Sequence, residues 1–198
     1  MQPDYFKCET KINARMENVN IYRKLTGNYS IPKDRTYWTL CNKQPDIEGS
    51  EIVQMIASGL IEKRQFHGVD NNEDIIKQNR IWHPDANWYF GDWIEVIEKE
   101  DFNPSLIYLD TTSFADYKIA SNMTVRTMLI CQPQTVLLVN AMLNDPRSSR
   151  KFDPAGLIRN LERQVPTLEL RMWNKEINNY SYSTTGKTGL VTYVFKKG

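Results

Sequence analysis

The sequence has few of the residues that mark disulfide-bonded, metal-bound or membrane-spanning proteins. It contains three cysteines, an odd number without paired spacing, and only two histidines. These numbers disfavour a disulfide framework, a structural zinc site and a metal pair built on histidine. No segment approaches the roughly 18 consecutive apolar residues of a membrane span, and the first residues carry charges where a secretory signal needs an apolar run. We therefore expect a cytoplasmic protein in a reducing compartment.

Charge of neither sign dominates the chain. Lys and Arg number 25 against 24 for Asp and Glu, which gives a formal net charge of +1. Composition therefore does not indicate a general surface for polyanions. A local contact with phosphate stays open near one polar loop and the helix predicted after it, and the alternative there is a solvated surface. The basic residues of this region are Arg147, Arg150, Lys151, Arg159 and Arg163.

Three widespread catalytic signatures are also missing. No serine lies in a GxSxG turn, so a nucleophile elbow is absent. The segment TTGKT at 184–188 lacks the preceding spacing and the strand-to-helix context of a phosphate-binding loop. A nicotinamide-dependent oxidoreductase is disfavoured because no GxGxxG follows the first predicted strand.

What the chain does have is a stretch in which three short apolar segments each carry an aspartate at or near their end. The segments are FHGVD with Asp70, NWYFGDW with Asp92, and SLIYLDTTSF with Asp110. Between them lie two blocks with helical spacing, at 71–80 and 94–101. Strands that alternate with helices predict a parallel sheet, in which all strand ends point to one edge. We therefore expect three carboxylates along the edge where open α/β sheets bind ligands.

The rest of the chain continues this alternation. The other predicted strands lie at 36–41, 135–143, 167–173 and 189–198. The other predicted helices lie at 51–60, 117–131 and 155–166. The turn-rich connection before the last strand predicts that the last two strands are antiparallel. Residues 1–35 predict a helical segment that packs on the domain formed by residues 36–198.

This layout resembles the class I S-adenosylmethionine-dependent methyltransferases, and the resemblance covers roughly Thr36 to Lys197. It implies an α/β fold with a mostly parallel, seven-stranded Rossmann-like sheet, helices on both faces and a C-terminal antiparallel hairpin. It also implies S-adenosylmethionine as the cofactor.

The resemblance assigns roles to residues at the strand ends. Asp70, followed by Asn71, corresponds to the acidic residue that holds the ribose hydroxyls, because a carboxylate can accept bonds from both vicinal donors. Asp92 corresponds to the residue that accepts a bond from the adenine amino group, and Trp93 to an apolar wall beside the purine. Each aspartate also has a simpler interpretation, as a cap of the helix that follows it.

The loop after the first predicted strand departs from the family pattern. The family has GxGxG there, where small residues let the backbone approach the methionine half of the cofactor, whereas this chain has CNKQPDIEGSEI. Cys41, Gly49 and Glu51 are the candidates for cofactor contacts in this stretch, and the carboxylate of Glu48 or of Glu51 can bind an ammonium group. Ser50 is the expected N-cap of the next helix.

The function implied by the resemblance is methyl transfer to an acceptor that the sequence leaves undecided between a small molecule and a nucleic acid. Asp110, with Thr111 after it, falls near the methyl donor and is the candidate to orient or deprotonate a hydroxyl or amine. The segment DTTS differs from the Asn/Asp-Pro-Pro-Tyr of enzymes that methylate amino groups of DNA. The alternative is a degenerate methyltransferase-like fold that acts as a non-catalytic binding or assembly module.

Overall fold

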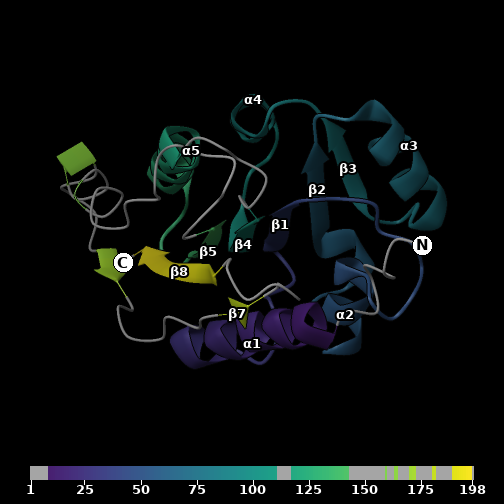
Figure 1. Cartoon of the computed structure of the whole chain (residues 1–198), viewed down its shortest axis with the longest axis horizontal. Helices are drawn as coiled ribbons and strands as arrows, with labels where there is room; N and C mark the ends of the chain where they lie inside the picture. The colour runs from purple at the N-terminus through teal and green to yellow at the C-terminus, as the bar shows by residue number, and fades with distance from the viewer. Residues whose placement is uncertain are drawn as a thin grey trace. The chain divides into compact units, whose positions relative to one another are not determined.

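The computed structural model describes residues 9–110, 117–142, 159, 163–164, 170–172, 180–181 and 189–197. Its contacts divide the chain into two compact units, Met1–Ile107 and Tyr108–Gly198. The boundary falls inside strand β4 (Pro104–Asp110), so each unit holds a part of that strand (Figure 1). Among the described residues, no helix is both long and apolar enough to cross a membrane.

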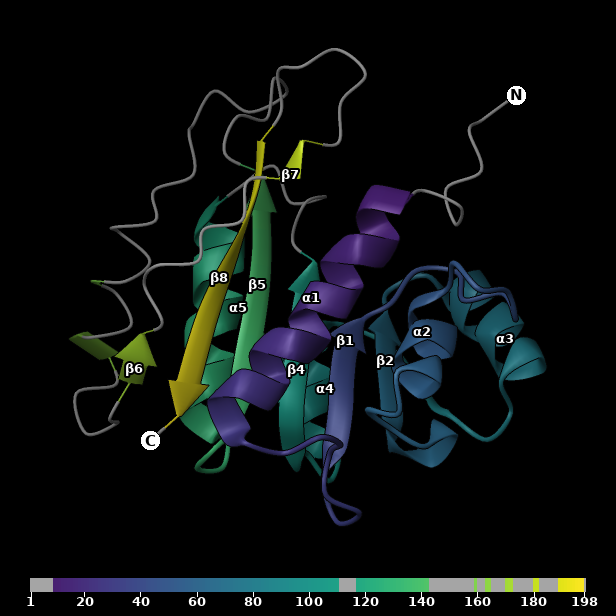
Figure 2. The ribbon, with the colours of Figure 1, turned by 90° about the horizontal axis from the view of Figure 1, so that it is seen from below.

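The first unit alternates strands and helices as the sequence predicts. Its strands are β1 (Thr36–Leu40), β2 (Phe66–Asp70), β3 (Asn87–Phe90) and the beginning of β4. Its helices are α1 (Glu9–Thr26), α2 (Glu51–Ala57), the short 3-10 helix η2 (Lys63–Gln65), α3 (Glu73–Trp82) and α4 (Trp93–Lys99). The strand order is β3-β2-β1-β4, and β2 is parallel to both of its neighbours. Helices α1 and α2 lie on one face of these strands and α4 lies on the other (Figure 2).

An aromatic cluster around Trp38 forms the core of this unit. The Trp38 side chain is fully buried, and its ring stacks on His67 at 4.5 Å and on Tyr89 at 5.2 Å between centroids. Phe102 and Trp93 approach the same ring edge-on at 5.0 Å and 6.3 Å. Burial lowers the pKa of His67 to about 4, so the imidazole is neutral near pH 7. Strands β1, β2 and β3 are therefore joined by ring stacking as well as by their backbone bonds.

Gly68 leaves room for the side chains of Trp88 and Cys41. A Cβ atom at this position would lie 2.6 Å from the Trp88 ring and 3.0 Å from the Cys41 sulfur. Glycine is thus the residue that leaves room for the indole over the middle of β2.

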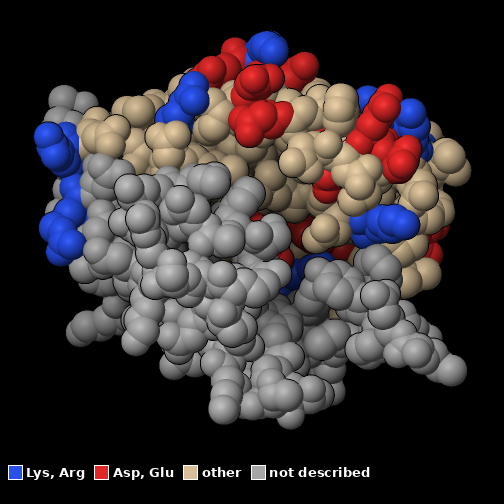
Figure 3. Space-filling model, turned by 45° about the horizontal axis from the view of Figure 1, so that its top comes forward, with Lys and Arg blue, Asp and Glu red and all other residues tan. Residues whose placement is uncertain are grey.

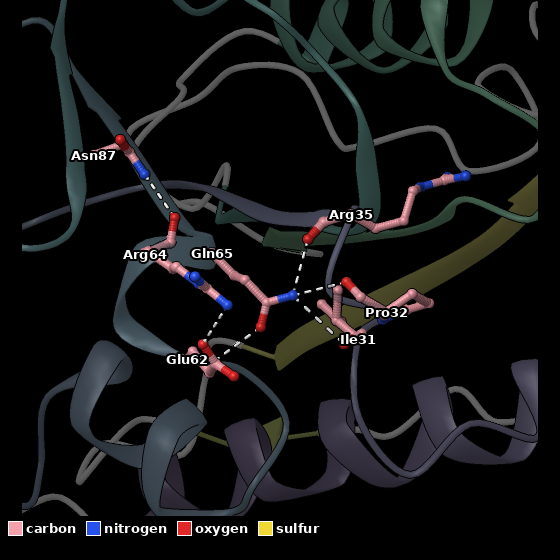
Figure 4. A network of polar contacts seen from close by, with 7 residues as sticks. All are labelled: Ile31, Pro32, Arg35, Glu62, Arg64, Gln65 and Asn87. Carbon is pink, nitrogen blue, oxygen red and sulfur yellow. Dashed lines mark hydrogen bonds and ion pairs between the residues drawn. The ribbon is translucent and has the colours of Figure 1, made fainter.

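A buried amide fixes the amino ends of β1, β2 and β3. The Nε2 group of Gln65 donates to the carbonyl oxygens of Pro32 at 2.8 Å and Arg35 at 3.0 Å, and its Oε1 accepts from the Glu62 backbone at 2.9 Å (Figure 4). The Asn87 side chain donates to the Arg64 carbonyl at 2.8 Å. Backbone groups at this edge are therefore bonded to side chains of the same unit.

The second unit contains the end of β4 together with α5 (Tyr117–Ile130), β5 (Val136–Met142), β6 (Leu170–Met172), β7 (Tyr180–Ser181) and β8 (Gly189–Lys197). Its strand order is β4-β5-β8-β6, and β8 is antiparallel to β5, β6 and β7. The predicted α/β class and the antiparallel C-terminal strands are confirmed. The predicted number of seven strands is wrong, because β7 also forms within the connection expected to contain only turns, which gives eight among the described residues.

Candidate functional site

The carboxyl ends of β1, β2 and β3 lie at one edge of the first unit. Leu40 is paired with Val69 and Asp70 with Phe90 in the two parallel ladders. Both ladders continue one residue past the strands, because the Cys41 amide donates to the Val69 carbonyl at 2.9 Å and the Gly91 amide to the Asp70 carbonyl at 3.1 Å. The backbone therefore places Cys41, Asp70 and the Gly91-Asp92 turn at neighbouring positions along this edge.

Asp70 ends β2 with its carboxylate half-buried. Its Oδ1 accepts one bond, from the backbone amide of Asn72 at 2.8 Å, and no other donor among the described residues reaches the carboxylate. Burial raises the pKa of Asp70, and the bond from Asn72 opposes that shift only in part. The helix after it is capped by Asn72, whose side chain accepts from Asp74 at 3.0 Å. Asp70 is thus an acceptor with unused capacity, and Asn71 beside it is exposed.

Asp92 has the capping role that the sequence left as its alternative. It is the N-cap of α4, and its Oδ1 accepts from the amides of Ile94 at 2.9 Å and Glu95 at 3.4 Å. Gly91 precedes it with a φ of 148°, a conformation that side chains rarely adopt. The turn at Gly91 sends the chain from β3 into α4 and leaves Asp92 exposed at the strand edge, with Oδ2 outside the capping bonds.

Phe90 is a residue of this edge that the sequence interpretation missed. It is the last residue of β3, pairs with Asp70 across the ladder and has a side chain that is 57% exposed. An exposed phenyl ring beside the end of β2 is a surface on which a flat ring can stack. The alternation of β3 gave no signal for it, because Trp88 two residues earlier is buried.

Cys41 lies near both Asp70 and Glu51, and the side chains of Cys41 and Glu51 are buried. Burial raises the pKa of the Cys41 thiol strongly, and the charges of Asp70 and Glu51 raise it further. The thiol is buried and accepts a long bond of 3.8 Å from the Asn79 amide. The Glu51 carboxylate is buried too, and Tyr37 donates its hydroxyl to it at 2.5 Å.

Gly49 and Ser50 belong to the loop between β1 and α2. Gly49 is buried, and its carbonyl accepts from Arg15 of α1 at 2.6 Å. Ser50 stands at the expected N-cap position of α2 but makes no side-chain capping bond. The prediction of a serine cap is therefore wrong, because the hydroxyl donates to the Pro45 carbonyl instead.

Trp93 is 2% exposed and packs edge-on against Trp38 and Phe102 in the core. In this conformation its ring lines no surface.

In the second unit, Asp110 is the half-buried last residue of β4, as predicted, while Thr111 lies outside the described residues. Arg147, Arg150 and Lys151 also lie outside them. No group of three metal-binding side chains occurs in the part of the chain that is described.

No family model matches the sequence, and no curated protein matches it. Solved structures do match the fold. The N-methyltransferase NodS from Bradyrhizobium japonicum, solved with S-adenosyl-L-homocysteine, is 10% identical with a TM-score of 0.62, over 96% of this chain and 89% of that one. An S-adenosylmethionine-dependent methyltransferase from Clostridium acetobutylicum is 12% identical with a TM-score of 0.59, over 100% and 93%.

A TehB-like methyltransferase from Corynebacterium glutamicum is 14% identical with a TM-score of 0.52, and the match covers 94% of this chain and 99% of that chain. At such identities the likeness concerns the fold. The chain thus has the fold of the class I S-adenosylmethionine-dependent methyltransferases, as its strand and helix order predicts.

Proposed function

We propose that the chain is an S-adenosylmethionine-dependent methyltransferase whose nucleoside-binding edge is formed by the carboxyl ends of β1, β2 and β3. The fold supports this proposal, since the solved structures it resembles include methyltransferases named for this cofactor. The observation that carries it is the half-buried carboxylate of Asp70, which ends β2 and accepts a single bond. Vicinal ribose hydroxyls are donors that such a carboxylate can bind as a pair.

Neighbouring groups suit the base of the same nucleoside. The exposed ring of Phe90 offers a stacking surface, and the exposed Asp92 offers its Oδ2 to an exocyclic amino group. Asn71 adds a polar side chain directly after Asp70. Cys41, Gly49, Glu51 and Trp93 contribute to this edge as buried supports, because their polar groups or rings contact residues of the protein.

Asp110 is the proposed catalytic residue, with Thr111 beside it. Methyl transfer to a hydroxyl or amine forms a bond from the acceptor to the methyl carbon and breaks the bond from that carbon to sulfur, so that S-adenosylhomocysteine leaves and the acceptor must lose a proton. A half-buried carboxylate at a strand end can orient that acceptor and take the proton. The acceptor class is a small molecule or a nucleic acid. Acidic side chains gather over α4 (Figure 3), which disfavours a polyanion on that face, and a phosphate contact near Arg147, Arg150 and Lys151 stays a proposal.

Calorimetry with S-adenosylmethionine and S-adenosylhomocysteine tests the proposal. We expect binding in the micromolar range, and we expect Asp70→Ala to weaken it at least about tenfold through loss of a charge-assisted contact. Asp74→Ala is the matched control, since Asp74 is an exposed carboxylate in the first turn of the next helix. Equal losses for the two variants would contradict a specific role of Asp70.

A non-catalytic binding module is the second candidate, and the loop after β1 favours it. Side chains fill that loop where the family has small residues, and Gln44 and Ser50 are buried within it. Calorimetry that shows no binding at millimolar S-adenosylmethionine would favour this candidate over the methyltransferase. The control is a cooperative thermal unfolding curve, which shows that the sample is folded.

A further inference from the structure

We infer that Asn79 of α3 and His83, the residue directly after this helix, are positioning residues for the ligand. They hold the loop 42–50, which joins β1 to α2, at the nucleoside-binding edge. Both side chains are fully buried, so they act through the loop and not by contact with the ligand. The inference rests on the proposed function and deepens it, because it names residues outside the strand ends on which ligand affinity depends.

The loop leaves the sheet beside the carboxylate proposed to bind the ribose. It starts directly after Cys41, whose amide still donates to a carbonyl of β2 at 2.9 Å. Asp70, at the end of β2, is close enough for its charge to raise the pKa of the Cys41 thiol, after the larger effect of burial. Asp46 and Glu48 within the loop are exposed. The conformation of the loop therefore also sets where these two carboxylates stand.

The side chain of Asn79 bonds to the beginning of this loop with both of its polar atoms. Its Oδ1 accepts from the Gln44 amide at 2.8 Å, and its Nδ2 donates to the Asn42 carbonyl at 3.0 Å. The Nδ2 group also donates a long bond of 3.8 Å to the Cys41 sulfur. A buried amide without partners would be costly, so these bonds make asparagine tolerable at this position.

His83 holds the same residue of the loop from the end of α3. Its Nε2 lies 2.7 Å from the Gln44 carbonyl and donates to it, because a carbonyl oxygen can only accept. Burial lowers the pKa of the imidazole, so the ring is neutral near pH 7 and its hydrogen lies on Nε2. Gln44 is thus fixed at its amide by one side chain and at its carbonyl by another.

The two residues occupy positions at which a helix usually presents apolar side chains to the core. Together with Ile76 they form the buried stripe of this helix and its cap, at spacings of three and four residues. An asparagine and a histidine contribute less apolar packing than an aliphatic residue would, while they supply partners for the backbone of Gln44. The polar side chains at these positions therefore serve the loop.

Gln44 extends this restraint to the far end of the loop. Its Oε1 accepts from the amides of Glu51 at 2.9 Å and Ile52 at 3.4 Å. Arg15 of α1 donates to the Gly49 carbonyl at 2.6 Å and fixes the loop at a further point. Loss of Asn79 or His83 should therefore loosen the loop well beyond the residues that they touch.

Calorimetry with S-adenosylhomocysteine on the intact chain tests the inference. Asn79→Ala removes the bonds from α3 to the loop. Ile76→Ala is the matched control, since it shortens a buried side chain of the same stripe that cannot form a hydrogen bond. We expect Asn79→Ala to weaken binding about tenfold and Ile76→Ala to stay within about threefold of the parent. Both are measured at a temperature at which thermal unfolding curves show folded protein.

A pair of variants at His83 adds a rescue that a purely structural role would not show, and it decides the question if Asn79→Ala does not fold. His83→Leu removes the donor to the Gln44 carbonyl. His83→Gln keeps an amide donor at about the place of Nε2. We expect a loss of about tenfold in His83→Leu and an affinity within about threefold of the parent in His83→Gln.

The remaining outcomes separate the inference from the proposed function. If the parent binds and Asn79→Ala and His83→Leu bind equally well, the inference is wrong while the proposed function stands. The same holds if Ile76→Ala and His83→Gln lose as much affinity as the other two variants. If the parent does not bind S-adenosylhomocysteine at millimolar concentration, the proposed function fails and the inference with it.

Discussion

The two ends of the same three strands in the first unit are finished in different ways. At the amino ends, the buried Gln65 side chain bonds to three loop carbonyls and one backbone amide. At the carboxyl ends, Asp70 accepts one bond and Phe90 is exposed. At both ends of the strands, backbone N–H and C=O groups leave the sheet and need hydrogen-bond partners.

The difference shows how one small sheet separates stability from binding. Bonds at the amino ends lower the free energy of the folded state, and they leave little capacity for a ligand. A half-buried carboxylate with one partner adds no such stability, because its burial costs free energy. The same carboxylate can bind a ligand, since a ligand with two donors offsets that desolvation cost. Substitutions at the two edges should therefore affect different measurements.

The largest expected effect comes from Gln65→Ala at the amino ends. The variant leaves the partly buried bonds from Gln65 to the carbonyls of Pro32 and Arg35 and to the amide of Glu62 unmade. We expect a loss of about 2 kcal/mol in the free energy of unfolding, measured by urea denaturation, because several partly buried backbone groups lose their partner at once. The affinity for S-adenosylhomocysteine of the remaining folded protein should stay within about twofold. A tenfold loss of affinity at unchanged stability would contradict the assignment of the amino ends to stability and of the carboxyl ends to binding.

A smaller effect is expected from Asp92, which caps α4 and is also proposed to bind the ligand. Asp92→Ala removes the cap of α4 and should cost about 1 kcal/mol of stability. Asp92→Asn keeps an oxygen for the amides of Ile94 and Glu95, so its melting temperature should stay close to that of the parent. If the Asp92 carboxylate also binds the amino group of the base, both variants should lower the affinity of the protein for the nucleoside. Unchanged affinity in Asp92→Asn would assign this residue to capping alone.

The smallest effect is expected for the stability of Asp70→Asn, and its sign is the informative part. Because the pKa of Asp70 is raised in the folded state, the folded chain holds this proton to a higher pH than the unfolded chain, and stability falls as the pH rises through that window. Removing the charge should therefore raise the melting temperature near pH 7, by no more than about 2 °C. The gain should vanish as the pH falls below 3.8, because the parent carboxyl is then protonated in both the folded and the unfolded state. A lower melting temperature at pH 7 would mean that the carboxylate has a stabilising partner.

The order of elements could be predicted from the sequence because each apolar segment had a length and an ending that suit a parallel strand. Asp70 and Asp110 stand at the ends of β2 and β4, where a carboxylate after a β-branched or leucine-rich run was expected. The short strand β7 could not be predicted, because its two residues have their partners in β8 and carry no pattern of their own.

The details of the loop after β1 could not be predicted for a different reason. Ser50 has the residue type and position of a cap, yet the capping oxygen comes from Gln44, seven residues before Glu51. Glutamine is not a preferred capping residue, and its contact depends on Asn79 and His83, which are distant in sequence. Local rules identify the helix end, whereas the choice of partner is set by tertiary packing.

Gly68 places a condition on how this protein can change. Since any side chain there would collide with the Trp88 ring and the Cys41 sulfur, a substitution at 68 is expected to be accepted only together with a smaller residue at 88. Among related sequences, the residues at positions 68 and 88 should therefore change together. A library that randomises position 68 alone should return glycine.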